Sequence, residues 1–585
     1  MSIDSIATDS TRRVRLYYEA CIPASLMMLA AWGCVERGKD GWPLASSVVV
    51  ALVAAALAVL ALAKQWPGAC STAQWRQRQR TDGLRAGADD GMVWGTLLVP
   101  LVVLAKGCDA MGDWTAAVSL AMALALVLFS RSSKNEPAAI ALFAAALLGL
   151  ASGIAAEGGV AGTCLAALGL LVVSLAQRRA VDAVLEGLPR SFTLGEAAVG
   201  VQGGVLVAVD LMVSCIWRRS EDGGSARVET LCTEAAVVGL VAMACVLATI
   251  FGARGRRRVL QGATGRALFI AIVASSAVCA LALVSHVAQT SVVAWGLHTL
   301  AQHGWASALL LLGYWAGVLG LAAILYLLLL PNGVSDSEAA SKFALHVRRK
   351  AFHLLAAALF VPGLLIARPV LHVGLTVALA VFCVAECARA LHVQPWATVI
   401  DQFVRGFTDY RDAGVLVTSH FYLLVGCAVP VWLGGSLVAQ LAGVLALGVA
   451  DAAASLVGVR FGRRRWPGTV KTLEGSGAFA ASLWAAALSV HALAPAPTAE
   501  AEAVAVVGPG PWSMLVLCAA LAVLEALTEQ NDNLVVPLAM HAAAHVLARA
   551  EGAAAWALPG AAGAVAWAAP RAAGLLRQRA KRSAR

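Results

Sequence analysis

The sequence predicts an all-α integral membrane protein that crosses the bilayer about 15 to 18 times. Three observations predict this class. Apolar residues make up 60% of the 585 residues and charged residues only 13%, which is too little charge to cover a soluble protein of this length. The apolar residues form long uncharged runs, such as Ala138–Ala155, Ala267–Ser285 and Ala306–Leu330, and a run of about 18 residues can span a bilayer core. Basic residues, finally, recur in alternate loops.

The basic loops predict the orientation of the chain. Arg131–Lys134, Arg178–Arg179 and Arg254–Arg258 recur at every second loop, as expected when positive loops stay in the cytosol, and Arg218–Arg227 breaks the pattern. Continued into the second half, the alternation places these segments on the cytosolic side: Ser341–Lys350, His392–Gly414, Gly458–Gly477, Thr528–Asn533 and the basic tail Arg571–Arg585. The net charge of +10 fits such loops, and no extended basic patch suggests nucleic-acid binding.

The chain is expected to have three regions. Residues 1–330 form a transmembrane region whose role the sequence does not reveal. Residues 331–550 contain most of the polar residues that need explaining, and residues 551–585 form a last span and the tail.

The densest polar segment runs from Asp451 to Ser476. Asp451 ends an apolar run, and a carboxylate near the bilayer boundary is costly unless it is paired, hydrated or bound to a cation. Four arginines, Lys471 and several glycines follow, and such residues suit phosphate groups, while a carboxylate can hold the accompanying divalent metal. The alternative is a basic membrane anchor without a ligand. The GxxxxGK[ST] motif of P-loop proteins is absent.

Other charged residues interrupt or end apolar runs. Arg348–Lys350 begin one run, and His353 falls one turn inside it as a core residue or a phosphate ligand. Glu386 and Arg389 are three residues apart and can pair with each other.

Acidic residues supply candidate metal ligands. Asp409 and Asp412 are either solvated charges or part of a metal site, and Glu525 and Glu529 share one helical face at the mouth of a span. The expected metal ligands are Asp451, Glu525, Asp532 and Asp409.

These segments resemble the dolichol kinase family, which is itself similar to phytol kinases, CTP-dependent diacylglycerol kinases and phosphatidate cytidylyltransferases. The resemblance covers roughly residues 340–550 and is carried by RRKAFH (348–353), FTDYRDAG (407–414), RWPGTVKTLEGS (465–476) and TEQNDNLVVPL (528–538). Ala450 departs from the Gly that often precedes the Asp, and Asn531 from the aliphatic residue usual before the Asp-Asn pair.

The resemblance implies that the Phe461–Ser476 loop binds CTP, and that Arg349, Lys350, Asp451 and Gly458 match positions important for activity. The catalytic residues are expected to be Asp451, Arg349, Lys350 and His353. The residues expected to contact CTP are Gly458, Gly462, Arg463, Arg464, Arg465, Trp466, Pro467, Gly468, Thr469, Lys471, Thr472, Glu474 and Gly475.

The resemblance further implies the reaction. A dolichol kinase of the endoplasmic reticulum membrane would transfer the γ-phosphate of CTP to dolichol, with a divalent metal, expected to be Mg²⁺, at a cytosolic site, and the product would serve protein glycosylation. The choice of CTP over ATP as the phosphate donor rests on the resemblance alone. A phytol or diacylglycerol kinase is the alternative within this class, and a transporter is the alternative from another class, because charges such as Asp210 lie within apolar runs. The sequence does not give the oligomeric state.

Overall fold

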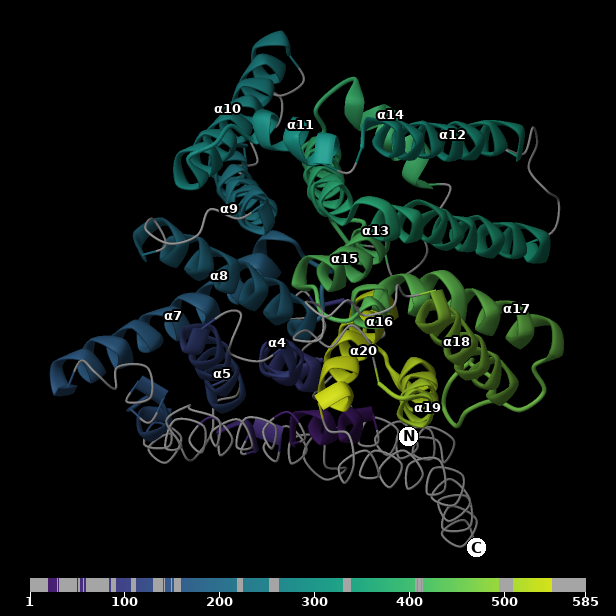
Figure 1. Ribbon diagram of the computed structural model, residues 1–585, viewed down its shortest axis with the longest axis horizontal. Coiled ribbons are helices and arrows are strands. Elements are labelled where there is room, and N and C mark those ends of the chain that lie inside the picture. The colour runs from purple at the N-terminus through teal and green to yellow at the C-terminus, as the bar shows by residue number, and fades with distance from the viewer. Residues whose placement is uncertain are drawn as a thin grey trace, which may run out of the picture. The chain divides into compact units, whose positions relative to one another are not determined.

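A computed structural model describes most of the chain between residues 91 and 549. The described ranges are 91–106, 112–129, 159–217, 225–251, 262–302, 304–329, 338–405, 408, 412, 414–493 and 509–549, with short pieces within 19–85 and 140–151. Within these ranges the chain is helical and contains no named strand (Figure 1).

Eight helices in the described ranges are long and apolar enough to cross a membrane, and five shorter helices are apolar too. The chain is therefore an all-α, multi-span membrane protein, as its composition predicts. The expected total of about 15 to 18 spans includes segments outside the described residues, such as the last span expected within residues 551–585, and the basic tail lies outside them too.

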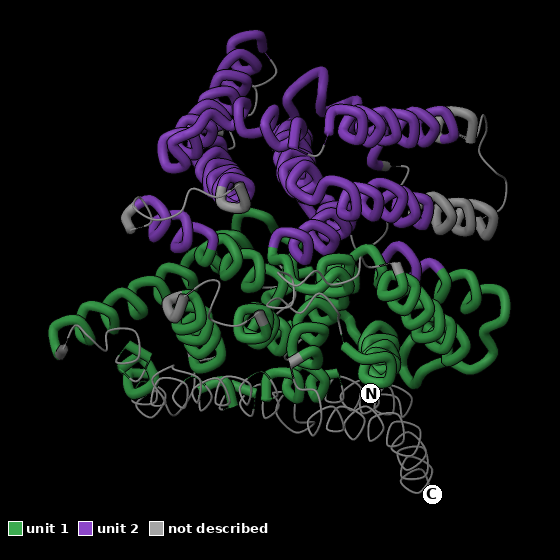
Figure 2. The backbone as a smooth tube through the Cα atoms, viewed as in Figure 1, with its two compact units in different colours: residues 1–206, 433–446, 453–585 green, residues 207–432, 447–452 purple. Residues whose placement is uncertain are grey.

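The chain folds into two compact units, coloured separately in Figure 2. Unit 1 comprises residues 1–206, 433–446 and 453–585, and unit 2 comprises residues 207–432 and 447–452. The chain thus leaves unit 1 after residue 206, forms unit 2, and returns to unit 1 at residue 433. Residues 447–452, which include Asp451, belong to unit 2 again. Neither unit ends at residue 330, so the functional division expected there remains a prediction.

Unit 1 is built around two buried helices, α19 (Pro511–Leu527) and α20 (Asp532–Arg549). Both are apolar on nearly every face, and residues such as Leu524, Ala539 and Ala543 are fully buried, which is typical of a central helix. The other helices of this unit are α4 (Met92–Lys106), α5 (Gly112–Phe129), α7 (Gly159–Gly187), the first half of α8 (Leu194–Trp217), α16 (Leu437–Gln440), α17 (Ala452–Phe461) from its second residue, and α18 (Leu473–Leu493).

Unit 2 is built from a second set of mostly apolar helices. They are the second half of α8, α9 (Ser225–Phe251), α10 (Ala263–Ala288), α11 (Val292–Gln302), α12 (Trp305–Leu329), α13 (Glu338–Ala390), α14 (Trp396–Arg405), α15 (Thr418–Leu433) and most of the π-helix η4 (Val444–Asp451). Apolar side chains from α9, α10 and α13 form one shared cluster around Phe269 and Leu247.

The helix α13 is two helices joined by a sharp bend. Ala367 has non-helical angles (φ −150°, ψ 71°) just before Pro369, which lacks a backbone N–H. A Cβ built on Gly363 would lie 3.4 Å from the Cβ of Leu371, whereas eight residues of straight helix span about 12 Å. The chain therefore folds back at Ala367. The two legs fit the predicted return of the chain to the cytosolic side at His392.

Candidate functional site

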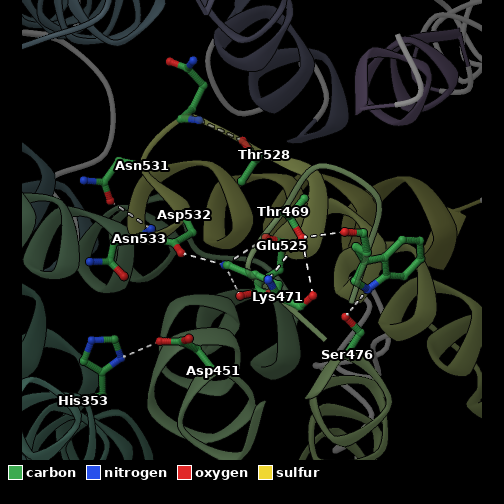
Figure 3. Close-up of polar contacts among 12 residues, drawn as sticks. His353, Asp451, Thr469, Lys471, Ser476, Glu525, Thr528, Asn531, Asp532 and Asn533 are labelled. Carbon is green, nitrogen blue, oxygen red and sulfur yellow. Dashed lines mark hydrogen bonds and ion pairs between the residues drawn. The ribbon is translucent and has the colours of Figure 1, made fainter. Parts of the chain in front are cut away.

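In unit 2, Asp451 meets two of the other residues predicted to be catalytic. Its carboxylate forms an ion pair with the ammonium of Lys350. Figure 3 shows its second contact, in which Oδ2 lies 3.3 Å from Nδ1 of His353. The same imidazole nitrogen lies 2.9 Å from the carbonyl oxygen of Leu447. Lys350 and His353 are three residues apart on α13, hence on one face. The structure describes no side chain for Arg349, although it belongs to the same helix.

Asp451 is the last residue of η4, a π-helix of eight residues. Such wide turns are rare and often occur at functional sites. The aspartate side chain is 13% exposed and that of His353 only 7%. A charge this buried needs its cation, so the ion pair with Lys350 explains how a carboxylate can end an apolar run.

In unit 1, Lys471 brings together two further predicted residues. Its ammonium forms an ion pair with the Glu525 carboxylate, lies 3.2 Å from Oδ2 of Asp532, and donates to the main-chain carbonyl of Glu525 at 3.0 Å (Figure 3). The Glu525 side chain is 6% exposed and that of Lys471 is 26% exposed. One cation is thus shared by two carboxylates from the end of α19 and the start of α20.

The predicted CTP loop is a short hairpin between α17 and α18. The amide of Trp466 donates to the carbonyl of Lys471 at 3.0 Å, and the amide of Leu473 donates to that of Arg464 at 2.8 Å. At its tip, Thr469 N–H donates to the carbonyl of Trp466 at 3.2 Å, and Gly468 has φ +71°. Proline followed by a glycine with positive φ is the signature of a type II turn.

Most of the glycines and polar residues predicted in this loop hold it in shape. The indole N–H of the buried Trp466 donates to Ser476 Oγ at 2.9 Å, and both carboxylate oxygens of Glu474 lie 3.2 Å from the amide of Arg464. The amide of Lys471 donates to Thr469 Oγ1 at 3.1 Å. The loop is therefore fixed internally before any ligand binds.

Two glycines allow α17 and α18 to approach closely. A Cβ on Gly462 would overlap the Gly458 carbonyl and the Thr472 side chain, and one on Gly475 would lie 3.0 Å from the Ala454 carbonyl. Thr472 also caps α18, because its Oγ1 accepts from the amide of Gly475 at 3.1 Å.

The arginines of the loop are its ligand-accessible charges. Arg463, Arg464 and Arg465 are all exposed, and the hairpin brings Arg464 to the N-terminus of α18, where its carbonyl accepts from the amide of Leu473. The partial positive charge of a helix N-terminus adds to their field. This end of unit 1 is suited to bind a polyanion.

The predicted metal ligands are found in different places. Glu525 and Asp532 converge on the Lys471 ammonium, Asp451 pairs with Lys350 and His353 in unit 2, and Asp409 lies outside the described residues. In the described part of the chain, no three His, Cys, Asp or Glu side chains gather closely enough to hold a metal alone. Mg²⁺ commonly takes one or two carboxylates together with substrate phosphates, so the donor pair Glu525 and Asp532 fits that ion.

Two other charged clusters are structural. Arg389 donates to both carboxylate oxygens of Glu386, at 2.9 and 2.6 Å, as their spacing predicts, and also to the Val415 carbonyl at 2.6 Å. Asp412 is buried and accepts from the amides of Thr418 and Ser419 at 3.1 and 3.0 Å, so it caps α15.

Comparison with known proteins points to the same family as the sequence motifs. Residues 181–423 match the family model described as dolichol kinase. The human dolichol kinase is 31% identical over 369 residues, which is 60% of this chain and 64% of the human protein.

The chain resembles the dolichol kinases.

Two further relatives extend this resemblance to plants and fungi. The Arabidopsis thaliana dolichol kinase EVAN is 35% identical over 227 residues, covering 37% of this chain and 39% of the relative. The Schizosaccharomyces pombe dolichol kinase sec59 is 36% identical over 203 residues, covering 34% and 38%. The matches thus span less than two thirds of these dolichol kinases. No solved structure matches the chain. The family resemblance seen in the sequence motifs is confirmed.

Residues that precede the stretch 340–550, which first suggested dolichol kinases, also contact the turn beside Asp532. Glu196, at the start of α8, accepts from the amide of Asn531 at 3.0 Å and forms an ion pair with Arg85 at 2.7 Å. Thr193 donates to the side chain of Gln530 at 2.6 Å. A sequence signal existed, since Thr193-Leu-Gly-Glu196 before an apolar run is a capping box. No feature of the sequence predicted the contacts of this capping box with Gln530 and Asn531.

Proposed function

We propose that the protein is a dolichol kinase, which transfers the γ-phosphate of CTP to the hydroxyl of dolichol. The observation that carries the proposal is the convergence of Lys471, Glu525 and Asp532 beside a preformed hairpin with three exposed arginines. The resemblance to dolichol kinases supplies the substrate class, and the multi-span fold suits a substrate that stays in the membrane.

Each group in the hairpin has a separate task. Arg463, Arg464 and Arg465, with the N-terminus of α18, bind the triphosphate, and Lys471 neutralises the charge that develops during transfer. Gly468, Thr469, Trp466 and the other internally bonded residues keep this surface in place. Prior fixation matters because phosphoryl transfer depends mostly on positioning and charge stabilisation.

Glu525 and Asp532 would hold a divalent metal, for which we propose Mg²⁺. When bound, the ion would neutralise phosphate charge. Asp451, held by Lys350 and His353, belongs to a separate acidic cluster in unit 2, and the positive-inside pattern predicts that both clusters face the cytosol.

The transfer forms one bond and breaks another. The dolichol oxygen attacks the γ-phosphorus, the bond to the β-phosphate oxygen breaks, CDP leaves, and the hydroxyl proton passes to a carboxylate. The product, dolichyl phosphate, would serve glycosylation in the endoplasmic reticulum.

The test uses purified protein in liposomes with γ-labelled CTP or ATP and with dolichol, phytol or diacylglycerol. We expect label to move from CTP to dolichol, and Asp451→Ala and Lys471→Ala to abolish the transfer. Gln402→Ala, an exposed change on α14, serves as the matched control.

Other outcomes would contradict the proposal. Label on phytol or diacylglycerol instead would assign another lipid alcohol as substrate. No transfer by folded protein, together with solute flux that does not require nucleotide, would establish a transporter instead.

A further inference from the structure

Three helix N-termini lie close together in unit 1, beside one buried carboxylate. They are the starts of α4 at Met92, α8 at Leu194 and α20 at Asp532. The approach is close: a Cβ on Gly195 would overlap the backbone of Gly91, and one on Gly91 would collide with the Gln530 side chain. The carboxylate belongs to Glu196, whose side chain is 2% exposed.

Glu196 links two distant parts of the chain. One oxygen accepts from the amide of Thr193 at 3.2 Å, closing the capping box of its own helix, whose other bond runs from Glu196 N–H to Thr193 Oγ1 at 3.1 Å. The other oxygen accepts from the amide of Asn531 at 3.0 Å and from Arg85 at 2.7 Å. The Thr193 hydroxyl adds a bond to Gln530 at 2.6 Å. Every partner is buried.

The linked turn carries a residue of the proposed site. Asn531 caps α20, because its Oδ1 accepts from the amide of Asn533 at 3.1 Å and its carbonyl accepts from the amide of Val535 at 3.1 Å. Asp532, the first residue of α20, then faces Lys471 at 3.2 Å. Anchoring the Asn531 amide therefore fixes the place from which the Asp532 carboxylate extends (Figure 3).

We infer that Glu196 is a positioning residue for the site, held by Arg85 and Thr193, which aligns Asp532 with Lys471. This assigns a role to part of the N-terminal region. The hydrogen bonds that join Glu196 to Asn531 and Thr193 to Gln530, here called the clamp, are a property of the fold. The inference therefore rests on the proposed function only where activity is measured. A buried anion suits this point, because helix N-termini and Arg85 both favour negative charge there.

The test compares Glu196→Gln with Glu19→Gln in the full-length protein. Glu19 is also buried in unit 1, where it accepts from Trp94 Nε1 of α4 at 2.7 Å. The first readout is amide hydrogen exchange of a peptide covering residues 528–535. We expect faster exchange in Glu196→Gln and unchanged exchange in Glu19→Gln.

The second readout is the kinetics of phosphate transfer from CTP to dolichol. Glu196→Gln should lower kcat by about 10- to 100-fold, as is usual for residues that orient a site from outside, and leave the KM for dolichol unchanged. Thr193→Val should lower kcat in the same way, and Thr193→Ser, which keeps the hydroxyl, should restore it.

The outcomes separate the two proposals. Faster exchange in Glu196→Gln, with a wild-type protein that transfers no phosphate, would overturn the proposed function and keep the clamp. Equal exchange in wild type and Glu196→Gln, or an equal rise in Glu19→Gln, would overturn the clamp. A kcat loss that Thr193→Ser does not recover would also count against it.

Discussion

Lys471 joins two carboxylates in the described part of unit 1. Glu525 and Asp532 both contact its ammonium, and the Glu525 carbonyl adds a third oxygen. Two negative charges and one positive charge leave the group net negative. Removing the cation would leave two carboxylates facing each other with little water around Glu525.

We therefore expect Lys471→Ala to lower both stability and transfer. The loss of stability should be about 1–3 kcal/mol, because the pair is partly exposed and lies between the buried and surface cases. Adding Glu525→Gln should recover part of the melting temperature, since the remaining repulsion is relieved, while transfer stays absent. Thermal unfolding and labelled-CTP assays measure the two effects. If the double variant melted no higher than Lys471→Ala, the ion pair would not be the stabilising contact.

The members of this cluster were predictable, but their pairing was not. Glu525 and Asp532 were predictable because charges at the ends of spans are costly. Lys471 was predictable because it lies in a basic segment with several glycines, which suits phosphate groups. Their contacts join residues 54 and 61 positions apart, and no local pattern specifies such a distance. The Thr193–Glu196 capping box is local and readable, whereas its bond to Asn531 depends on the packing of whole helices.

At the scale of elements, the hairpin between α17 and α18 owes its shape to one backbone position. Gly468 has φ +71°, which costs a residue with a Cβ about 1 kcal/mol. Gly468→Ala should raise the KM for CTP several-fold, because the turn opens and the arginines lose their alignment. Gly468→Asn should stay nearer to wild type, since asparagine tolerates this region. Initial rates against CTP concentration measure the effect, and equal KM values for both variants would contradict the role of the turn.

The short helix α14 has a different relation to the membrane from the spans. Its ten residues cover about 15 Å, which is too short to cross. Ala397 is buried and Ile400 packs on the core, while Trp396, Val399 and Phe403 form an exposed apolar stripe. Such a helix suits the interface plane.

A photo-crosslinking residue placed at Val399 should therefore react with lipid. The same probe at Thr398, an exposed polar position about 100° around the helix from Val399 and off the apolar stripe, should give far fewer lipid adducts. Mass spectrometry of adducts in liposomes measures the ratio. Equal labelling at both positions would show that α14 does not lie at the lipid boundary.

Some elements could not be read from the sequence. The apolar run ending at Asp451 predicts a helix, and η4 is one, but its π-type winding leaves no periodic signal. The sharp bend in α13 has a visible cause in Pro369, although Pro362 lies in the same helix without a comparable break.

At the scale of the molecule, composition alone predicted the fold class, because bilayer thickness constrains every span alike. The division into units was beyond such reasoning, since unit 1 combines the two ends of the chain. Helices α4 and α8 begin close to the start of α20, and Glu196 joins α8 to the turn before α20.

Residues 331–585 should consequently fail as a separate protein. We expect this fragment to be inactive and prone to aggregation, because α20 loses its partners from residues 85–206. Co-expression with residues 1–330 should restore dolichol phosphorylation in part. Size-exclusion chromatography and the transfer assay measure both outcomes. An active, monodisperse 331–585 fragment would show that the N-terminal region is dispensable.

The bond between Glu196 and Asn531 also has a consequence for biosynthesis. Its partners are 335 residues apart, and a ribosome adding about 5–20 residues per second needs roughly 17 to 67 seconds to make that stretch. Throughout this interval Arg85, made earlier, is the available counter-charge for Glu196. The N-terminal helices therefore cannot make this contact until residue 531 has been synthesised, when only about the last tenth of the polypeptide remains to be made.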